Sequence, residues 1–340
     1  MKELLRKLPK VELHLHLDGS LRAKTVKELA AEQGIELPAE MIEDLKSHLQ
    51  VNSNWSSSLE EYLQKFELPV KIMQSKKAIS RVAYELVEDV ASENVRYLEL
   101  RFAPLLLTAE LSKEEVVETV LAALQRAEED YGVQSRVILC CMRNQDPAQS
   151  TKVAQLALDY LTEGVVALDL AGDEANFPPE EHEQAFCLAK GGGLHRTVHA
   201  GEAAGVESVR KAIDFLQAQR IGHGIRAGED EETLEIIKEK EIALEVCPSS
   251  NVHTGVVDSL GEHPIKEYYQ EGVPVTVNTD NRTVSNTTLT EEYLKLQQRL
   301  DFSLADIKEL ILNGVKAAFI SKEEQEELLE EFKAEFAALD

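Results

Sequence analysis

The histidines of the segment HLHLDGS, His14 and His16, have the spacing of a metal-binding pair. Side chains two residues apart on a β-strand point to the same side, so both imidazoles can reach one ion. The same alternation aims Glu12 and Asp18 with them toward the interior of a fold whose other face is apolar. Burying such groups unpaired would cost roughly 2 to 7 kcal/mol per neutral group, and a metal removes that cost for the histidines. A hydrogen-bonded histidine pair is the alternative.

Similar polar residues follow other apolar segments along the chain. His199 and Glu202 lie in HAGE, His223 lies in GHG, and Asp280 lies in NTDN. Three histidines and one carboxylate can form a zinc shell that leaves room for water. The spacing leaves open which histidine is a ligand and which is a base.

Glu202 and Gly172 also have two interpretations each. A carboxyl group in a dry pocket has a raised pKa and can donate a proton, whereas a first-turn helix cap is the structural alternative for Glu202. Gly172, in LAGDE, can bring a backbone N–H close to a ligand or can form a plain turn. Surface or hydrogen-bonding roles are expected for the remaining histidines, which are His48, His182, His195, His253 and His263.

The elements that must position these residues form a repeating pattern. Eight short segments rich in Val, Ile and Leu are predicted strands, at 11–19, 95–104, 135–143, 165–173, 194–202, 220–224, 243–251 and 274–281. Helical patterns separate most of them, with a capping box at Ser112 and Glu115, a proline start at Pro178 and Pro179, and a start at Ser303.

This order predicts an α/β fold, a (β/α)8 TIM barrel forming a single domain over residues 1–340. A doubly wound open sheet is the alternative. The long interval between Gly19 and Val95 predicts extra helices inserted after the first strand, and the acidic segment 322–340 predicts a solvated helix.

Composition narrows the possible partners and location. With 36 basic and 62 acidic residues the formal net charge is −26, which disfavours binding to nucleic acid or to anionic membranes. Four scattered cysteines, no predicted signal peptide and no membrane-length apolar segment indicate a cytoplasmic protein. A neutral or cationic small molecule is the expected partner, and no pattern in the sequence specifies an oligomeric state.

Taken together, the motifs resemble those of the adenosine deaminase family, within the amidohydrolase superfamily. The matching segments occur in family order across nearly the whole chain: HLHLDGS at 14–20, ELRFAP at 99–104, CCMR at 140–143, DLAGDE at 169–174, TVHAGE at 197–202, RIGHG at 220–224, EVCPSSN at 245–251, HPI at 263–265 and NTD at 278–280. The resemblance implies zinc-dependent hydrolysis of adenosine, and also of 2′-deoxyadenosine, to inosine and ammonia in purine salvage.

The resemblance also assigns roles that spacing does not. One Zn²⁺ per chain would be held by His14, His16, His199 and Asp280. His223 would be the general base and electrostatic anchor for the attacking water, assisted by Asp280. Glu202 would protonate N1 of the purine ring.

Substrate contacts follow from the same resemblance. The implied substrate-binding residues are His16, Asp18, Gly172 and Asn281, with Asp18 on a ribose hydroxyl and the Gly172 N–H on N3. Many family members carry a second acid after Asp280, where this sequence has Asn281. Because N7 is an acceptor, the amide N–H of Asn281 can donate to it directly, and base recognition is predicted to survive. An apolar lid is predicted from the helical spacing of Leu59, Tyr62, Leu63 and Phe66, with core packing as the alternative.

Two other functions compete with this one. A related enzyme could act on free adenine or on a 6-substituted adenylate, although Asp18 favours a nucleoside and a phosphate would need cations such as Arg22, Lys24 and Arg282. A non-catalytic binding protein on the same fold is the alternative from another class. Such a protein should have lost a metal ligand or the residue that protonates the purine, and this sequence has all of the residues implied for those roles.

Overall fold

Eight parallel strands in sequential order form the centre of the computed structural model, which describes residues 1–51 and 58–339. The strands are β1 (Lys10–His16), β2 (Val95–Phe102), β3 (Gln134–Met142), β4 (Val165–Ala171), β5 (His195–Ala200), β6 (Arg220–His223), β7 (Ala243–Val246) and β8 (Val275–Val277). Backbone hydrogen bonds join the end of β1 to the segment after β8, with His16 N donating to Asp280 O at 2.8 Å and Asp280 N donating to His14 O at 2.9 Å. The sheet therefore closes into the predicted barrel, and the open doubly wound alternative is wrong.

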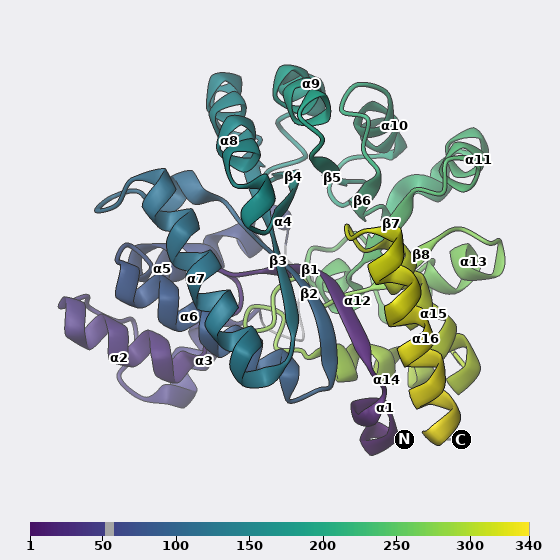
Figure 1. Ribbon diagram of the computed structural model, residues 1–340, viewed down its shortest axis with the longest axis horizontal. Coiled ribbons are helices and arrows are strands. Elements are labelled where there is room, and N and C mark those ends of the chain that lie inside the picture. Colours follow the sequence, from purple (N-terminus) through teal and green to yellow (C-terminus); the bar gives the residue numbers. More distant parts are fainter. Residues whose placement is uncertain (52–57, 340) are drawn as a thin grey trace.

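Helices surround the strands, and both chain ends lie on one side of the view in Figure 1. Those before β2 are α1 (Lys2–Lys7), α2 (Ala23–Gln33), α3 (Ile42–Leu49), α4 (Leu59–Leu63), α5 (Glu67–Ile72) and α6 (Lys76–Ala91). Those that follow are α7 (Lys113–Tyr131), α8 (Pro147–Asp159), α9 (Glu183–Gly191), α10 (Val206–Asp214), α11 (Glu231–Glu239), α12 (Pro248–His253), α13 (Ile265–Gln270), α14 (Leu289–Arg299), α15 (Leu304–Ala317) and α16 (Lys322–Leu339). Helices α2 to α6 are the predicted insertion after the first strand.

Local sequence signals fix several of the helix boundaries. Ser112 and Ser303 begin α7 and α15 with complete capping boxes, each accepting from a backbone N–H one turn on. Pro179 starts a short 3-10 turn that leads into α9. The strands are shorter than predicted at their carboxyl ends, because the polar motif residues leave the sheet there to form the loops.

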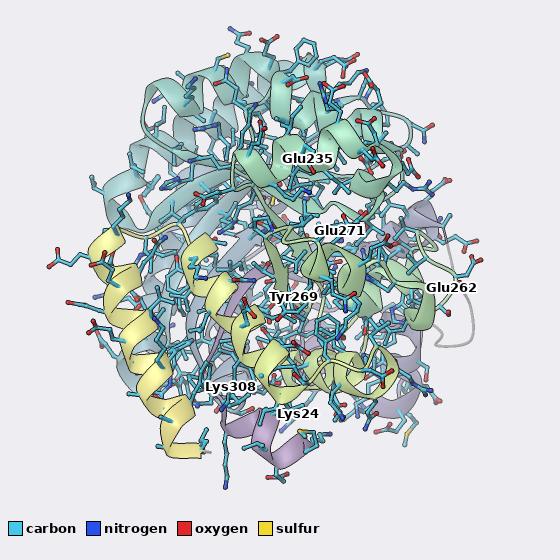
Figure 2. All side chains as sticks on the ribbon, turned by 90° about the vertical axis from the view of Figure 1, so that its right-hand side faces the viewer. Lys24, Glu235, Glu262, Tyr269, Glu271 and Lys308 are labelled. Carbon is cyan, nitrogen blue, oxygen red and sulfur yellow. The ribbon has the colours of Figure 1, made fainter. Side chains whose placement is uncertain are left out.

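The barrel packs on its helices through one large apolar core. Helix α15 approaches β1 so closely at Gly314 that a Cβ there would lie 2.4 Å from Val11 Cγ2. Acidic side chains such as Glu235, Glu262 and Glu271 lie on the outer surface, as Figure 2 shows. Within the described residues, no helix has the combination of length and hydrophobicity that crossing a membrane requires.

Candidate active site

A cavity of about 310 Å³ opens where the carboxyl ends of the strands meet. It brings together sequence-predicted residues from five separate segments: His16, Asp18, Gly172, His199, Glu202, His223, Asp280 and Asn281. All four predicted lid residues, Leu59, Tyr62, Leu63 and Phe66, line it as well. Tyr62 and Phe66 also pack with Val51 and Val284. Both interpretations of these residues are therefore confirmed, since they line the cavity and also pack in a small apolar core.

A cluster of histidines and one aspartate forms the polar side of the cavity. One potential ligand atom from each of His14, His199, His223 and Asp280 lies within 4.8 Å of the others. His16 adjoins this cluster, because its Nε2 lies 3.2 Å from His199 Nε2 and 3.4 Å from Asp280 Oδ1. His14 Nε2 is buried without a hydrogen-bond partner. A metal ion satisfies that orphaned nitrogen, so the residues fit a metal site.

Two buried carboxylates orient the histidines of the cluster. Glu245 accepts a hydrogen bond from His14 Nδ1 at 2.8 Å, and Asp169 accepts one from His199 Nδ1 at 3.1 Å. Both rings must therefore carry their proton on Nδ1 and present a bare Nε2, as metal-ligating histidines do.

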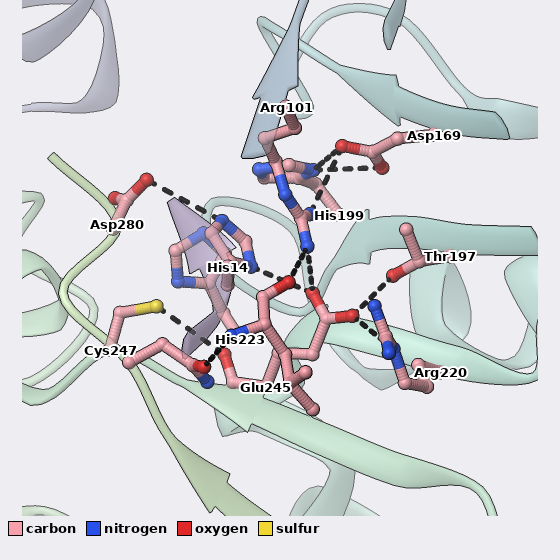
Figure 3. Close-up of polar contacts among 12 residues, drawn as sticks. His14, Arg101, Asp169, Thr197, His199, Arg220, His223, Glu245, Cys247 and Asp280 are labelled. Atoms are coloured by element: carbon pink, nitrogen blue, oxygen red, sulfur yellow. Dashed lines mark hydrogen bonds and ion pairs between the residues drawn. The ribbon is translucent and has the colours of Figure 1, made fainter. Parts of the chain in front are cut away.

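Arginines balance the charge of these carboxylates. Arg101 donates to both Asp169 and Glu245, and Arg220 donates to Glu245 from the other side. Figure 3 shows Glu245 at the centre of these contacts. Burial alone would raise the pKa of Glu245, but the two guanidinium charges hold that pKa well below its usual value. No role was assigned to these carboxylates and arginines from the sequence. The signal that could have found them is the presence of charged residues within otherwise apolar strands.

Glu12 does not take the predicted position among the histidines. Its carboxylate accepts from the backbone N and hydroxyl of Thr279, at 2.8 and 3.2 Å. The pairing of β1 with β2 shifts register between Glu12 and Leu15, which breaks the strict alternation on which the prediction depended. Burial raises the pKa of Glu12 to about 8.

Glu202 is buried against the cluster, with its Oε2 3.5 Å from His223 Nε2. Burial, followed by the negative charges of Asp280 and Glu174, raises its pKa well above the ordinary value. A carboxyl group whose pKa is raised in this way holds its proton to higher pH and can act as an acid.

The loop that carries Glu202 is held by one carboxylate that sequence reasoning did not single out. Glu174 accepts from four successive backbone N–H groups, those of Gly201, Glu202, Ala203 and Ala204, at 2.6 to 3.0 Å. The motif LAGDE therefore contributes two functional residues: Gly172, and the carboxylate that holds the loop of Glu202.

Strained backbone marks the same edge of the barrel. His223 and Asp280 have φ angles of 62° and 59°, in the left-handed region that non-glycine residues rarely adopt. Gly172 lines the cavity with a φ angle of 100°, a backbone conformation that residues with a side chain rarely adopt. Strain of this kind persists where the surrounding structure enforces it, commonly at functional sites.

Asp18 and Asn281 lie in the cavity wall with unpaired oxygens. Asp18 Oδ1 and Asn281 Oδ1 are both buried without a hydrogen-bond partner. Burial raises the pKa of Asp18 to about 6. Asn281 Nδ2 donates to the Tyr62 hydroxyl at 3.0 Å, and a Cβ at Gly19 would lie only 1.7 Å from Asn281 Oδ1. Gly19 is therefore needed to make room for this amide.

An eight-stranded parallel barrel with a histidine and aspartate cluster, and a buried acid, at the carboxyl ends of its strands has the architecture of a metal-dependent hydrolase. Comparison with known proteins identifies the family within this class. Residues 9–335 match the model of the family described as adenosine deaminase. The chain belongs to the adenosine deaminase family.

Individual relatives agree with this assignment. The chain is 47% identical to a protein named adenosine deaminase from Clostridium acetobutylicum, over 97% of this chain and 98% of that protein. Among solved structures it is similar to an adenine deaminase from Arthrobacter aurescens, with a TM-score of 0.90 and 29% identity over 96% of this chain and 98% of that chain. It is also similar to an Arabidopsis N6-mAMP deaminase, with a TM-score of 0.85 and 30% identity over 98% and 99% of the two chains.

Proposed function

We propose that residues 1–340 form one catalytic domain that hydrolyses adenosine, and 2′-deoxyadenosine, to inosine and ammonia. The observation that carries this proposal is the position of Glu202, which is buried in the same cavity as the histidine and aspartate cluster with its Oε2 3.5 Å from His223 Nε2. Family membership supports the reaction class, and the C. acetobutylicum relative is named for this activity.

The metal is proposed to be one Zn²⁺, held by His14, His16, His199 and Asp280. Imidazole nitrogens and a carboxylate oxygen are donors that zinc accepts. When bound, zinc supplies a Lewis-acidic centre that makes water nucleophilic near neutral pH.

The side chains of this protein supply the remaining steps. Glu202 donates its proton to N1, so that C6 can accept the oxygen of water. His223 and Asp280, which line the same cavity as Glu202, would hold the attacking water. The C6–O bond forms, the C6–N bond breaks, and the amino group leaves as ammonia with one proton from water. Inosine keeps the proton on N1, so the second proton of water restores Glu202. Asp18 would bind a ribose hydroxyl.

Two further groups are proposed to read the base. The N–H of Gly172 would donate to N3, and the amide of Asn281 would donate to N7. Both residues line the cavity, and the planar amide has a second N–H besides the one used on Tyr62.

Charge in and around the cavity favours a nucleoside over a nucleotide. Among the described residues, the cavity lining contains no lysine or arginine, whereas it contains several carboxylates. Arg22 is bound to Asp89 and Glu88 instead, and Arg282 is paired with Glu93. These cations are therefore already neutralised and do not form the phosphate pocket that an adenylate would need.

Turnover of adenosine, adenine and AMP by zinc-loaded protein tests the proposal. We expect kcat/KM for adenosine to exceed that for either competitor by at least about 10²-fold, because a missing ribose contact or a buried, unpaired phosphate costs roughly 3 kcal/mol. Preference for adenine would refute the role of Asp18, and preference for AMP would refute the charge argument.

The cytoplasm is the proposed location. Cys140, Cys141, Cys187 and Cys247 are all free, and three of them are buried. Free thiols in these numbers are typical of proteins in reducing compartments.

A further inference from the structure

A chain of three hydrogen-bond contacts, through two buried side chains, connects the backbone of α13 to the catalytic histidine. Ile265 N lies 3.1 Å from His263 Nδ1, His263 Nε2 lies 3.1 Å from Asn251 Oδ1, and Asn251 Nδ2 lies 3.0 Å from His223 Nδ1. His223, Asn251 and His263 are at most 3% exposed, so water does not compete for these contacts.

Only the first contact of this chain has a donor that is fixed by covalent structure. The backbone N–H of Ile265 can only donate, so His263 Nδ1 must accept and cannot carry a proton. The ring of His263 is therefore neutral with its proton on Nε2. That N–H donates to the carbonyl oxygen of Asn251, because an amide turned the other way would bring two donors together.

The orientation of the Asn251 amide also determines the protonation of His223. With its oxygen facing His263, the amide of Asn251 directs an N–H at His223 Nδ1, which must accept. An imidazolium has N–H groups at both nitrogens, so this contact also excludes the charged form of His223. His223 therefore carries its single proton on Nε2, the nitrogen that faces Glu202 at 3.5 Å.

We propose that Asn251 and His263 are positioning residues that fix the tautomer of His223, so that its Nε2 is a hydrogen-bond donor in the resting enzyme. The neighbouring histidines have the opposite tautomer. His14 and His199 direct Nδ1–H at carboxylates and leave Nε2 bare. His223 therefore differs from the proposed metal ligands in the position of its proton, although its ring lies within the same cluster.

The inference revises the role that family resemblance implied for His223, and its mechanistic part depends on the proposed function. An Nε2–H group cannot take a proton from water, but it can hold and stabilise the attacking oxygen as negative charge develops there. The proton that water releases would then pass to the carboxylate of Asp280, the other group proposed to hold the water.

Nitrogen NMR of the zinc-loaded protein, labelled with ¹⁵N-histidine, tests this directly, because bare and protonated ring nitrogens have well-separated shifts. His223→Gln and His263→Gln assign the signals. We expect a proton on Nε2 and none on Nδ1 for both His223 and His263. In Asn251→Asp, a carboxylate replaces the amide donor, and His223 Nδ1 is expected to acquire a proton.

Asn313→Asp is the matched control, since it makes the same chemical change on α15 next to Lys316. It should leave every histidine signal of the active site in place. For adenosine, Asn251→Asp with a bare Nε2 is expected to lower kcat on the order of 10²-fold, the cost of losing one preorganised donor.

A proton on Nδ1 of His223 in the wild-type protein would overturn the proposal, and so would a bare Nδ1 in folded Asn251→Asp. Wild-type kcat in an Asn251→Asp enzyme whose Nε2 is bare would overturn the donor role. If Asn251→Asp does not fold, the wild-type spectrum decides alone. The spectrum is independent of substrate, so a protein that fails to deaminate adenosine refutes the proposed function without affecting this test.

Discussion

Replacing Glu174 by glutamine removes one charge beneath the loop that carries the catalytic acid. The carboxylate accepts four backbone N–H groups, with Oε1 taking Gly201 and Oε2 taking the next three residues. Glutamine keeps a single acceptor oxygen. If the amide oxygen takes the position of Oε2, it keeps three hydrogen bonds, which are now made to a neutral acceptor. The NH₂ group then takes the position of Oε1 and faces the N–H of Gly201, so two donors meet.

The structural cost follows from these contacts. Hydrogen bonds to a charged group contribute about 1.5 to 3 kcal/mol, and neutral ones about 0.5 to 1.5 kcal/mol. Three weakened bonds and one orphaned donor should together lower the free energy of unfolding by about 3 kcal/mol, allowing for their mutual dependence. With an unfolding entropy of about 2.1 cal/mol/K per residue over 340 residues, this is a Tm decrease of about 4 °C.

The same change alters the pH dependence of the reaction. After burial and Asp280, the charge of Glu174 raises the pKa of Glu202, so its removal lowers that pKa. Glu202 must be protonated to act, and activity disappears as pH rises through its pKa. The alkaline limb of the kcat profile is therefore expected to move to lower pH in Glu174→Gln.

Calorimetry and pH–rate profiles measure both effects, with Glu335→Gln as the control for the loss of one partly exposed ion pair, to Arg96. Glu335→Gln should leave the profile unchanged and alter Tm by about 1 °C or less. An alkaline limb that stays in place or moves to higher pH in Glu174→Gln would refute the electrostatic reasoning. An unchanged Tm would refute the role of Glu174 in holding the loop.

Three further substitutions test other parts of the site. Asp169→Asn removes the carboxylate that orients His199 and should weaken zinc binding by roughly 10- to 100-fold in chelator competition; an unchanged affinity would contradict this. Arg101→Met removes the arginine bound to Asp169 and leaves Glu245 with Arg220, and it should lower the free energy of unfolding in urea by roughly 3 to 5 kcal/mol, whereas a change below about 1 kcal/mol would show that Arg101 is dispensable. Gly19→Ala places a methyl group against the amide of Asn281 and should lower kcat/KM for adenosine by about tenfold or more, so wild-type kinetics would argue against the close approach.

The barrel and most of the cavity residues could be predicted from the sequence because their signals are local. Apolar segments of strand length, capping boxes and proline starts each depend on neighbouring residues, and they located the strands to within a few positions. The motif ends HLDG, HAGE and NTD marked the side chains that meet at the carboxyl ends of the strands.

Contacts between distant strands could not be predicted in the same way. The partnerships of Glu245 with His14 and of Asp169 with His199 depend on register across the barrel, which no single segment encodes. The error at Glu12 has the same origin, since a register shift within β1 changes which side chains share a face. His263 was expected to form hydrogen bonds, and it does, but its link to the active site became visible only with the fold.

The most direct test of the central claim compares adenosine deamination by zinc-loaded wild-type protein and by Glu202→Gln, at matched zinc content. We expect the wild-type protein to convert adenosine to equal amounts of inosine and ammonia, with the ultraviolet absorbance change following the reaction. Glu202→Gln should fold and retain zinc, but kcat should fall by roughly 10² to 10⁴-fold, because glutamine cannot supply the proton. A zinc-loaded wild-type protein that leaves adenosine unchanged, or a glutamine variant with wild-type kcat, would contradict the account.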